Sequence, residues 1–152
     1  RIDDKGLAVS KDYIGRNPAQ KTYAQAAEAR AKLWTHFQNV PMARWLAEVK
    51  AHYKETDAGL IIRYDPKLRD AVLEAGAQPT PDLWPLFDAL VDLPLALIRG
   101  ANSDFLTVET ADEMARRRPD MIRADIPGRG HVPFLDEPEA LDALHQWLEK
   151  LQ

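Results

Sequence analysis

The spacing of apolar residues changes near residues 79–81, where Pro-Thr-Pro interrupts the chain. Before this point apolar residues recur at intervals of three and four, which is typical of helices. This pattern predicts helices over residues 23–37, from Pro41 to about Asp57, and over residues 66–75. The short β-branched stretch at 60–64 is either a strand or an extended connection. The first part of the chain is therefore expected to be almost entirely helical.

After residue 81 the pattern alternates between strand and helix. A continuous apolar run at 95–99 predicts a strand buried on both faces. A helix is expected over 107–118 with Thr107 as its N-cap, followed by a strand at 121–126 and a terminal helix at 137–151. Two strands joined by one helix form a right-handed parallel crossover. The predicted fold class is α/β, with a helical region followed by a parallel βαβα unit.

Two residues with acid–base chemistry follow the two predicted strands. Asp104 lies five residues after Arg99, and His131 lies five residues after Ile126. Ligands of open α/β sheets bind beyond the carboxyl ends of the strands, so both loops should meet at one edge. A carboxylate can orient an imidazole that then acts as a general base. The simpler alternative is that Asp104 is a turn or cap residue and His131 is a surface group.

Composition narrows the class of protein. The chain has 152 residues, of which 45% are apolar and 29% charged, and its net charge of −4 argues against a basic nucleic-acid or membrane footprint. It has no cysteine, which excludes disulfides, thiolate zinc sites and cysteine nucleophiles. No apolar run is long enough to cross a bilayer. The first residue is Arg1 and not methionine, so any targeting signal could have been lost with the start. We expect a cytoplasmic location, although the cysteine count does not identify the compartment.

The residues around the acid and the histidine resemble those of a known family. Residues 98–106, Ile-Arg-Gly-Ala-Asn-Ser-Asp-Phe-Leu, resemble the acid loop of α/β-hydrolases. Residues 128–133, Gly-Arg-Gly-His-Val-Pro, followed by Leu-Asp-Glu-Pro at 135–138, resemble the catalytic-histidine loop of this family. Residues 13–18 are similar to cap sequences of bacterial members. The resemblance implies a partial α/β-hydrolase fold, with a helical cap at 1–80 and the carboxyl-terminal part of the core at 81–152.

This resemblance implies a catalytic role for two residues. Asp104 would be the acid and His131 the general base of a triad whose family order is nucleophile, acid, histidine. The nucleophile is missing, because the only serines are Ser10 and Ser103 and neither lies in G-x-S-x-G. We expect the carboxyl-terminal portion of a serine-type hydrolase that cleaves an ester, lactone or related acyl substrate. The isolated chain should be inactive, and no cofactor is implied.

Other readings of the same residues stay open. The chain can belong to a non-catalytic binding module of this fold, or to a dehalogenase, epoxide hydrolase or carbon–carbon bond hydrolase. The expected partners are a small acyl substrate and the missing amino-terminal half of the same protein, and a homo-oligomer is a further candidate. Neither nucleic acid nor a membrane is expected as a partner.

Several side chains are candidates for contact with the substrate. Trp34 and Phe37 lie on predicted cap helices, where packing is the alternative role, and Phe105 and Val132 adjoin the acid and the histidine. No metal site is expected, because the remaining histidines, at 36, 52 and 145, do not have ligand spacing. The basic run at 116–118 is most simply a solvated helix end.

Overall fold

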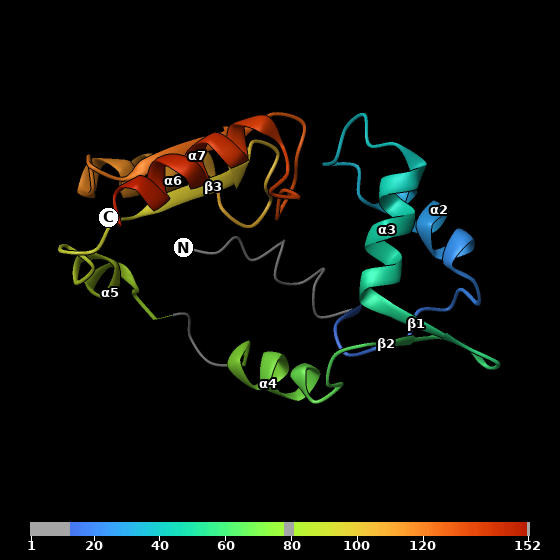
Figure 1. Ribbon diagram of the computed structural model, residues 1–152. Coiled ribbons are helices and arrows are strands. Elements are labelled where there is room, and N and C mark those ends of the chain that lie inside the picture. The colour runs from blue at the N-terminus through green and yellow to red at the C-terminus, as the bar shows by residue number, and fades with distance from the viewer. Residues whose placement is uncertain (1–12, 78–80, 152) are drawn as a thin grey trace. The chain divides into compact units, whose positions relative to one another are not determined.

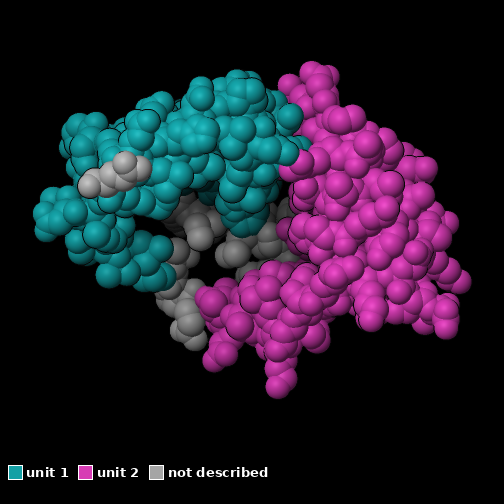
Figure 2. Space-filling view, in the orientation of Figure 1, with its two compact units in different colours: residues 1–5, 80–152 teal, residues 6–79 magenta. Residues whose placement is uncertain are grey.

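The computed structural model describes residues 13–77 and 81–151. The chain divides into two compact units, one formed by residues 6–79 and the other by residues 1–5 together with 80–152 (Figure 2). Each unit is described by itself below. Within the described ranges, no helix is both long and apolar enough to cross a membrane.

The unit formed by residues 6–79 is built on two packed helices and a hairpin. Its elements are α2 (Tyr23–Leu33), α3 (Met42–His52), β1 (Tyr53–Thr56), β2 (Gly59–Ile62) and α4 (Leu68–Ala75), labelled in Figure 1. The helices α2 and α3 pack against each other and bury a small core from both, which comprises Ala26, Ala27, Trp45 and Val49. Thr22 caps α2, because its side-chain oxygen accepts a hydrogen bond from the Gln25 N–H.

The expectation that the second helix continues to Asp57 is wrong. The helix ends at His52, and the next four residues form β1, which pairs antiparallel with β2 from Tyr53↔Ile62 to Thr56↔Gly59. A two-residue turn joins the strands, and Gly59 follows it with φ +122°, which side chains other than glycine rarely adopt. The strand alternative for the β-branched stretch after Gly59 is thus the correct one.

The unit that contains residues 80–152 has the predicted order of strands and helices. Its elements are α5 (Trp84–Asp88), β3 (Ala96–Gly100), α6 (Val108–Arg117), β4 (Ile122–Ile126) and α7 (Pro138–Glu149). β3 and β4 are parallel and joined through α6, as predicted. Thr107 is the N-cap of α6, as predicted, and accepts a hydrogen bond from the Thr110 N–H.

The packing of this sheet differs from the prediction of a strand buried on both faces. In β3, only Arg99 and Gly100 are buried, whereas the three apolar residues before them are half-buried. The helix α7 lies against both strands with Ala140 and Ala143 buried. The indole N–H of Trp147 donates to the Pro94 carbonyl at 2.9 Å, which ties α7 to the segment before β3.

The basic run at 116–118 is not a simple solvated helix end. Arg118 is only 5% exposed and donates to the Asp120 carboxylate at 2.8–2.9 Å and to the carbonyls of Leu90 and Leu93. The Arg117 guanidinium lies 4.3 Å from the ring centroid of Trp84, and it also pairs with acidic side chains. The prediction was wrong because a guanidinium has enough N–H donors to form hydrogen bonds with several loop carbonyls at once. These two arginines fasten the segment before β3 to α6.

Candidate active site

The loops that follow β3 and β4 lie at the same edge of the parallel pair. We call residues 101–106 the acid loop and residues 127–137 the histidine loop. The register pairs Gly100 with Ile126, so both loops begin at the same level. The Ala101 N–H donates to the Ile126 carbonyl, and the Asn102 N–H donates to the Arg129 carbonyl, each at 2.9 Å. Backbone hydrogen bonds therefore join the loop that carries Asp104 to the loop that carries His131.

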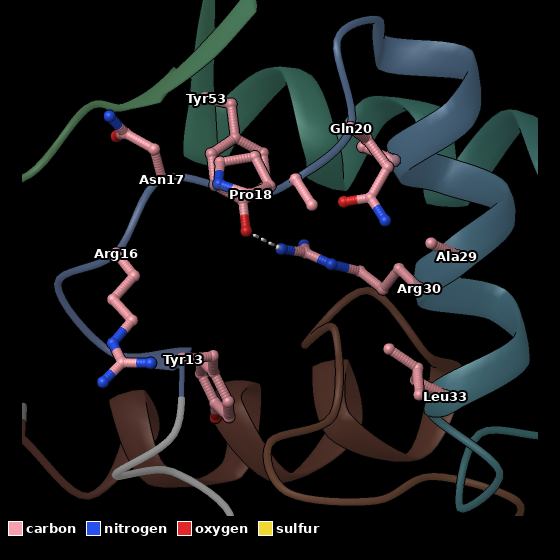
Figure 3. Close-up of a pocket in the computed structure, with 11 residues that line it drawn as sticks. Tyr13, Arg16, Asn17, Pro18, Gln20, Ala29, Arg30, Leu33 and Tyr53 are labelled. Atoms are coloured by element: carbon pink, nitrogen blue, oxygen red, sulfur yellow. Dashed lines mark hydrogen bonds between the residues drawn. The ribbon is translucent and has the colours of Figure 1, made fainter.

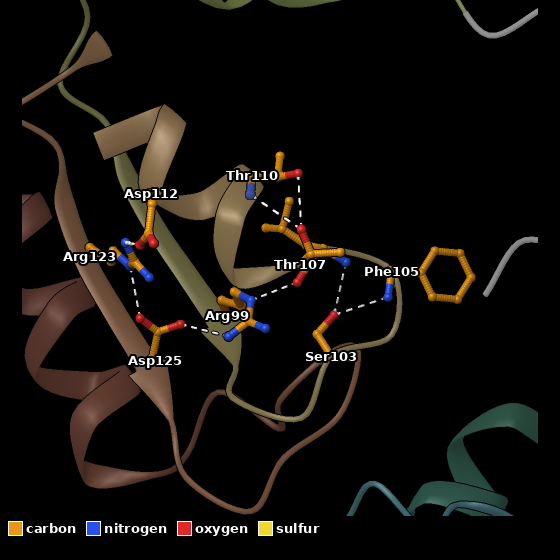
Figure 4. A network of polar contacts seen from close by, with 9 residues as sticks. Arg99, Ser103, Phe105, Thr107, Thr110, Asp112, Arg123 and Asp125 are labelled. Carbon is orange, nitrogen blue, oxygen red and sulfur yellow. Dashed lines mark hydrogen bonds and ion pairs between the residues drawn. The ribbon is translucent and has the colours of Figure 1, made fainter. Parts of the chain in front are cut away.

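A serine holds the turn of the acid loop in which Asp104 lies. The hydroxyl oxygen of Ser103 accepts hydrogen bonds from the N–H groups of Phe105 at 3.3 Å and Leu106 at 3.1 Å (Figure 4). A serine oxygen that accepts two nearby backbone N–H groups stabilises a local turn. Ser103 therefore stabilises the turn of the acid loop next to Asp104.

A buried arginine anchors the end of the same loop. Arg99 is 7% exposed; its Nε donates to the Leu106 carbonyl at 2.6 Å, and its Nη1 lies 2.9 Å from Asp125 Oδ1. Arg99 and Asp125 are direct partners in the parallel register, so their side chains leave the sheet on the same face. The acid loop is thus held from its base by a residue of β3.

The ion pair continues from the sheet into α6. Asp125 also accepts from Arg123 Nε at 2.8 Å, and Arg123 Nη1 donates to Asp112 of α6 at 2.7 Å (Figure 4). Sequence reasoning did not assign a role to Arg99. The signal was present, because a charged residue at the end of an apolar strand needs a partner when buried.

The histidine loop has an anchor of its own. Arg129 Nε donates to Glu137 Oε1 at 2.7 Å, and the Phe134 N–H donates to the same oxygen at 3.2 Å. Glu137 is buried at the start of α7. Gly128 has φ +65°, a conformation that glycine adopts without strain, and lies at the turn that leads out of β4. The carboxylate of Glu137 therefore closes the loop around His131.

The imidazole of His131 stacks on an aromatic ring of the acid loop. The ring centroids of His131 and Phe105 are 4.7 Å apart and the planes are inclined by 21°. Desolvation lowers the pKa of His131 below its usual value of 6.5, and the negative charge of Asp104, which raises the pKa, only partly offsets this. The imidazole is therefore neutral at pH 7 and can accept a proton. The sign of the Asp104 effect is that expected for an acid that stabilises an imidazolium.

The other predicted site residues fall into two groups. Phe105 lies against His131, and Val132 next to it is 59% exposed. Trp34 and Phe37 belong to the other unit, where they pack with Trp45 at centroid distances of 5.4–5.9 Å. Trp45 is buried, so this cluster contributes to the core of that unit. Contact of these four predicted residues with a substrate stays a prediction.

Within residues 13–77 and 81–151, no group of three or more histidine or acidic side chains is arranged to hold a metal ion. The chemistry at the loop edge is that of an acid, a base and an aromatic ring.

The structure and the sequence are similar to those of known hydrolases. The structure superposes on the crystal structure of an α/β hydrolase from Novosphingobium aromaticivorans with a TM-score of 0.85 and 34% sequence identity, over 99% of this chain and 53% of that one. The sequence is 36% identical over 81 residues to the 3-hydroxybutyrate-oligomer hydrolase of Cupriavidus necator, over 51% of this chain and 27% of that protein. The chain has a partial α/β-hydrolase fold.

A more distant solved structure shares the fold alone. E-2-(acetamidomethylene)succinate hydrolase has 18% identity and a TM-score of 0.73, over 97% of this chain and 53% of that one. No protein-family model matches the sequence. The chain spans about half the length of these solved structures and about a quarter of the length of the C. necator relative.

We predict that Arg99→Leu lowers the free energy of unfolding of this protein by about 2–3 kcal/mol. The substitution leaves the Leu106 carbonyl without its donor and removes a buried partner of Asp125. Urea unfolding followed by circular dichroism measures the change. The matched control is Arg116→Leu, whose side chain is 70% exposed and whose ion pair with Glu113 should contribute little to stability. Equal losses of unfolding free energy in both variants would contradict the role of Arg99 as a buried anchor of the acid loop.

Proposed function

We propose that the protein containing this chain is a serine-type hydrolase that cleaves an ester, lactone or related acyl bond. Asp104 is the triad acid and His131 the general base. The observation that carries the proposal is the joined pair of loops at the carboxyl ends of β3 and β4, with the Asp104 charge acting on a His131 that is neutral at pH 7.

The proposed chemistry uses both ring nitrogens of His131. One nitrogen takes the proton of a serine hydroxyl as the serine oxygen attacks the acyl carbon, and the imidazolium then gives this proton to the leaving alcohol. In the second half, His131 takes a proton from water as the water oxygen attacks the acyl-enzyme, and the imidazolium then returns this proton to the serine oxygen as the carboxylic acid is released. Asp104 stabilises the imidazolium formed in each half. Phe105, stacked on His131, keeps the ring in place.

The nucleophile is proposed to come from outside residues 1–152. The chain contains two serines; Ser103 already holds the turn of the acid loop, and neither serine lies in a nucleophile-elbow motif. We therefore propose that the chain alone does not turn over esters. The amino-terminal part of the same protein is the proposed partner that supplies the serine and the oxyanion donors.

The name of the C. necator relative supports the choice of an ester bond. Oligomers of 3-hydroxybutyrate are linked through esters, and the relative hydrolyses such oligomers according to its name. We propose an acyl substrate of the same broad class for this protein. The cytoplasmic location and self-association expected from the sequence stay predictions.

Asp104→Asn in the full-length protein tests the proposal. We expect kcat on p-nitrophenyl butyrate to fall by on the order of 10³–10⁴, because the asparagine no longer stabilises the imidazolium. The Asp104 charge raises the pKa of His131, so its loss lowers this pKa further. The active form has neutral His131, and activity is lost as pH falls through this pKa. The acid limb of kcat/KM should therefore move to lower pH in the variant.

The control for this variant is Asp142→Asn, which removes the same charge from an exposed position on α7. It should leave kcat and the pH profile unchanged. A full-length Asp104→Asn protein with kcat near that of the unchanged protein would refute the triad assignment, provided its circular dichroism spectrum shows it is folded.

A further inference from the structure

The unit formed by residues 6–79 contains a cavity of about 280 Å³ that the proposed chemistry does not use. It lies between the segment before α2, the helix α2 itself and the first residue of β1 (Figure 3). Its volume is at the lower end of the range of small-molecule sites. The cavity is therefore large enough for a small ligand.

The charged residues around this cavity are all cationic. Arg16 and Arg30 contribute to the wall, and among the described residues no acidic side chain lines it. Neither arginine has an ion pair with another described residue. In Figure 3 Arg30 reaches from α2 towards the middle of the cavity, and Arg16 stands on the opposite side of the view. Two unpaired guanidinium groups around one small cavity favour an anion.

Aromatic rings hold the guanidinium of Arg30 in position. Its central carbon lies 4.9 Å from the ring centroid of Trp34 and 5.6 Å from that of Tyr53, within cation–π range. Its Nη2 donates to the Tyr53 hydroxyl over a long 3.5 Å. The Arg30 Nη1 lies 3.4 Å from His52 Nδ1, which is 2.8 Å from the Glu48 carbonyl and donates to it. Because His52 Nδ1 donates its hydrogen to the Glu48 carbonyl, it does not accept a hydrogen bond from Arg30. The guanidinium of Arg30 therefore keeps N–H donors that a ligand can use.

Part of the wall is apolar and comprises Ala26, Ala29 and Leu33 of α2 together with Pro18, whereas Asn17 and Gln20 contribute side-chain amides. The apolar part suits the hydrocarbon portion of a ligand, which inorganic phosphate lacks. A guanidinium fork is complementary to a carboxylate, which it can bind with two parallel hydrogen bonds.

We propose that this cavity binds a short-chain organic carboxylate. The carboxylate lies against the fork of Arg30, the charge of Arg16 adds attraction, and the hydrocarbon part contacts Leu33 and Ala29. The site uses only residues within one unit of the chain. Its occupancy is a binding equilibrium, which does not require turnover.

Titration of the full-length protein with butyrate, followed by isothermal calorimetry, tests the proposal. Intrinsic tryptophan fluorescence is a second readout, because Trp34 lies against Arg30. We expect saturable binding of butyrate, and a Kd at least tenfold higher in Arg30→Gln, which loses the charged fork. Arg30→Lys should recover part of the affinity, since it restores the charge without the bidentate geometry. Arg16→Gln should weaken binding by a smaller factor.

The matched control is Lys32→Gln, which removes one positive charge from an exposed position of α2 that does not line the cavity. Its Kd for butyrate should be unchanged. Butyramide, which lacks the charge, should not bind. The proposal is overturned if the unchanged protein does not bind butyrate, if inorganic phosphate binds as tightly, or if folded Arg30→Gln retains the affinity. Because calorimetry detects binding in the absence of an ester, failure here does not bear on the hydrolase proposal, and loss of hydrolysis in Asp104→Asn does not bear on this site.

Discussion

Replacement of His131 by alanine in the full-length protein is expected to lower kcat for ester hydrolysis by on the order of 10⁵–10⁶. The general base is the group through which both proton transfers pass, so its removal stops acylation and deacylation together. The pKa of His131 lies below 6.5 in the folded chain, so the neutral base is already the main form at pH 7. Of the other histidines, His145 lies on α7, and His36 and His52 belong to the unit formed by residues 6–79.

The effect of His131→Ala should fall on kcat with little change in KM, since the imidazole reacts and does not hold the substrate. Steady-state kinetics with p-nitrophenyl butyrate separates the two constants. His145→Ala, which removes an exposed imidazole from α7, is the matched control and should behave as the unchanged protein. A His131→Ala protein that keeps a tenth of the activity would show that another group acts as the base.

The meeting of the loops that carry Asp104 and His131 followed from the sequence because it depends on few features. One apolar strand, one capped helix and a second strand leave only the right-handed parallel crossover, and this topology brings the two following loops to one edge. The register then sets the loops level with each other, and backbone hydrogen bonds at Ala101 and Asn102 join them.

Other parts of the site depend on side chains that a local pattern does not resolve. The sequence pattern placed Arg99 in a strand but did not predict its partner. Only the register of the two strands shows that Arg99 lies opposite Asp125. Arg118 looked solvated because its partners, the carbonyls of residues 90 and 93, are 25–28 positions away in sequence. The hairpin after His52 was hidden because Tyr53 continues the helical spacing of apolar residues, whereas the turn and its pairing with β2 end the helix. In each case a contact between distant residues overrides the local signal.

The close approach between the end of β3 and the histidine loop gives the largest expected effect on stability. A Cβ at Gly100 would overlap the Gly130 carbonyl oxygen and would lie 2.5 Å from the Arg129 carbonyl oxygen and 2.8 Å from the Arg129 carbonyl carbon. These are backbone atoms, which cannot rotate away as the end of a side chain can. The methyl group of alanine therefore requires β3 or the histidine loop to move, and the hydrogen bond from Asn102 to Arg129 spans the same place.

We expect Gly100→Ala to lower the free energy of unfolding by about 3 kcal/mol or more, at the upper end of the cost of overpacking. Urea unfolding followed by circular dichroism measures this change. Gly76→Ala is the matched control: Gly76 has φ −74°, which alanine adopts readily, so that variant should be unchanged or more stable by up to about 1 kcal/mol. The same displacement moves the loop that carries His131, so the folded fraction of Gly100→Ala should also lose hydrolytic activity. An unfolding free energy within 1 kcal/mol of the unchanged protein would mean that β3 and the histidine loop are not in contact at Gly100.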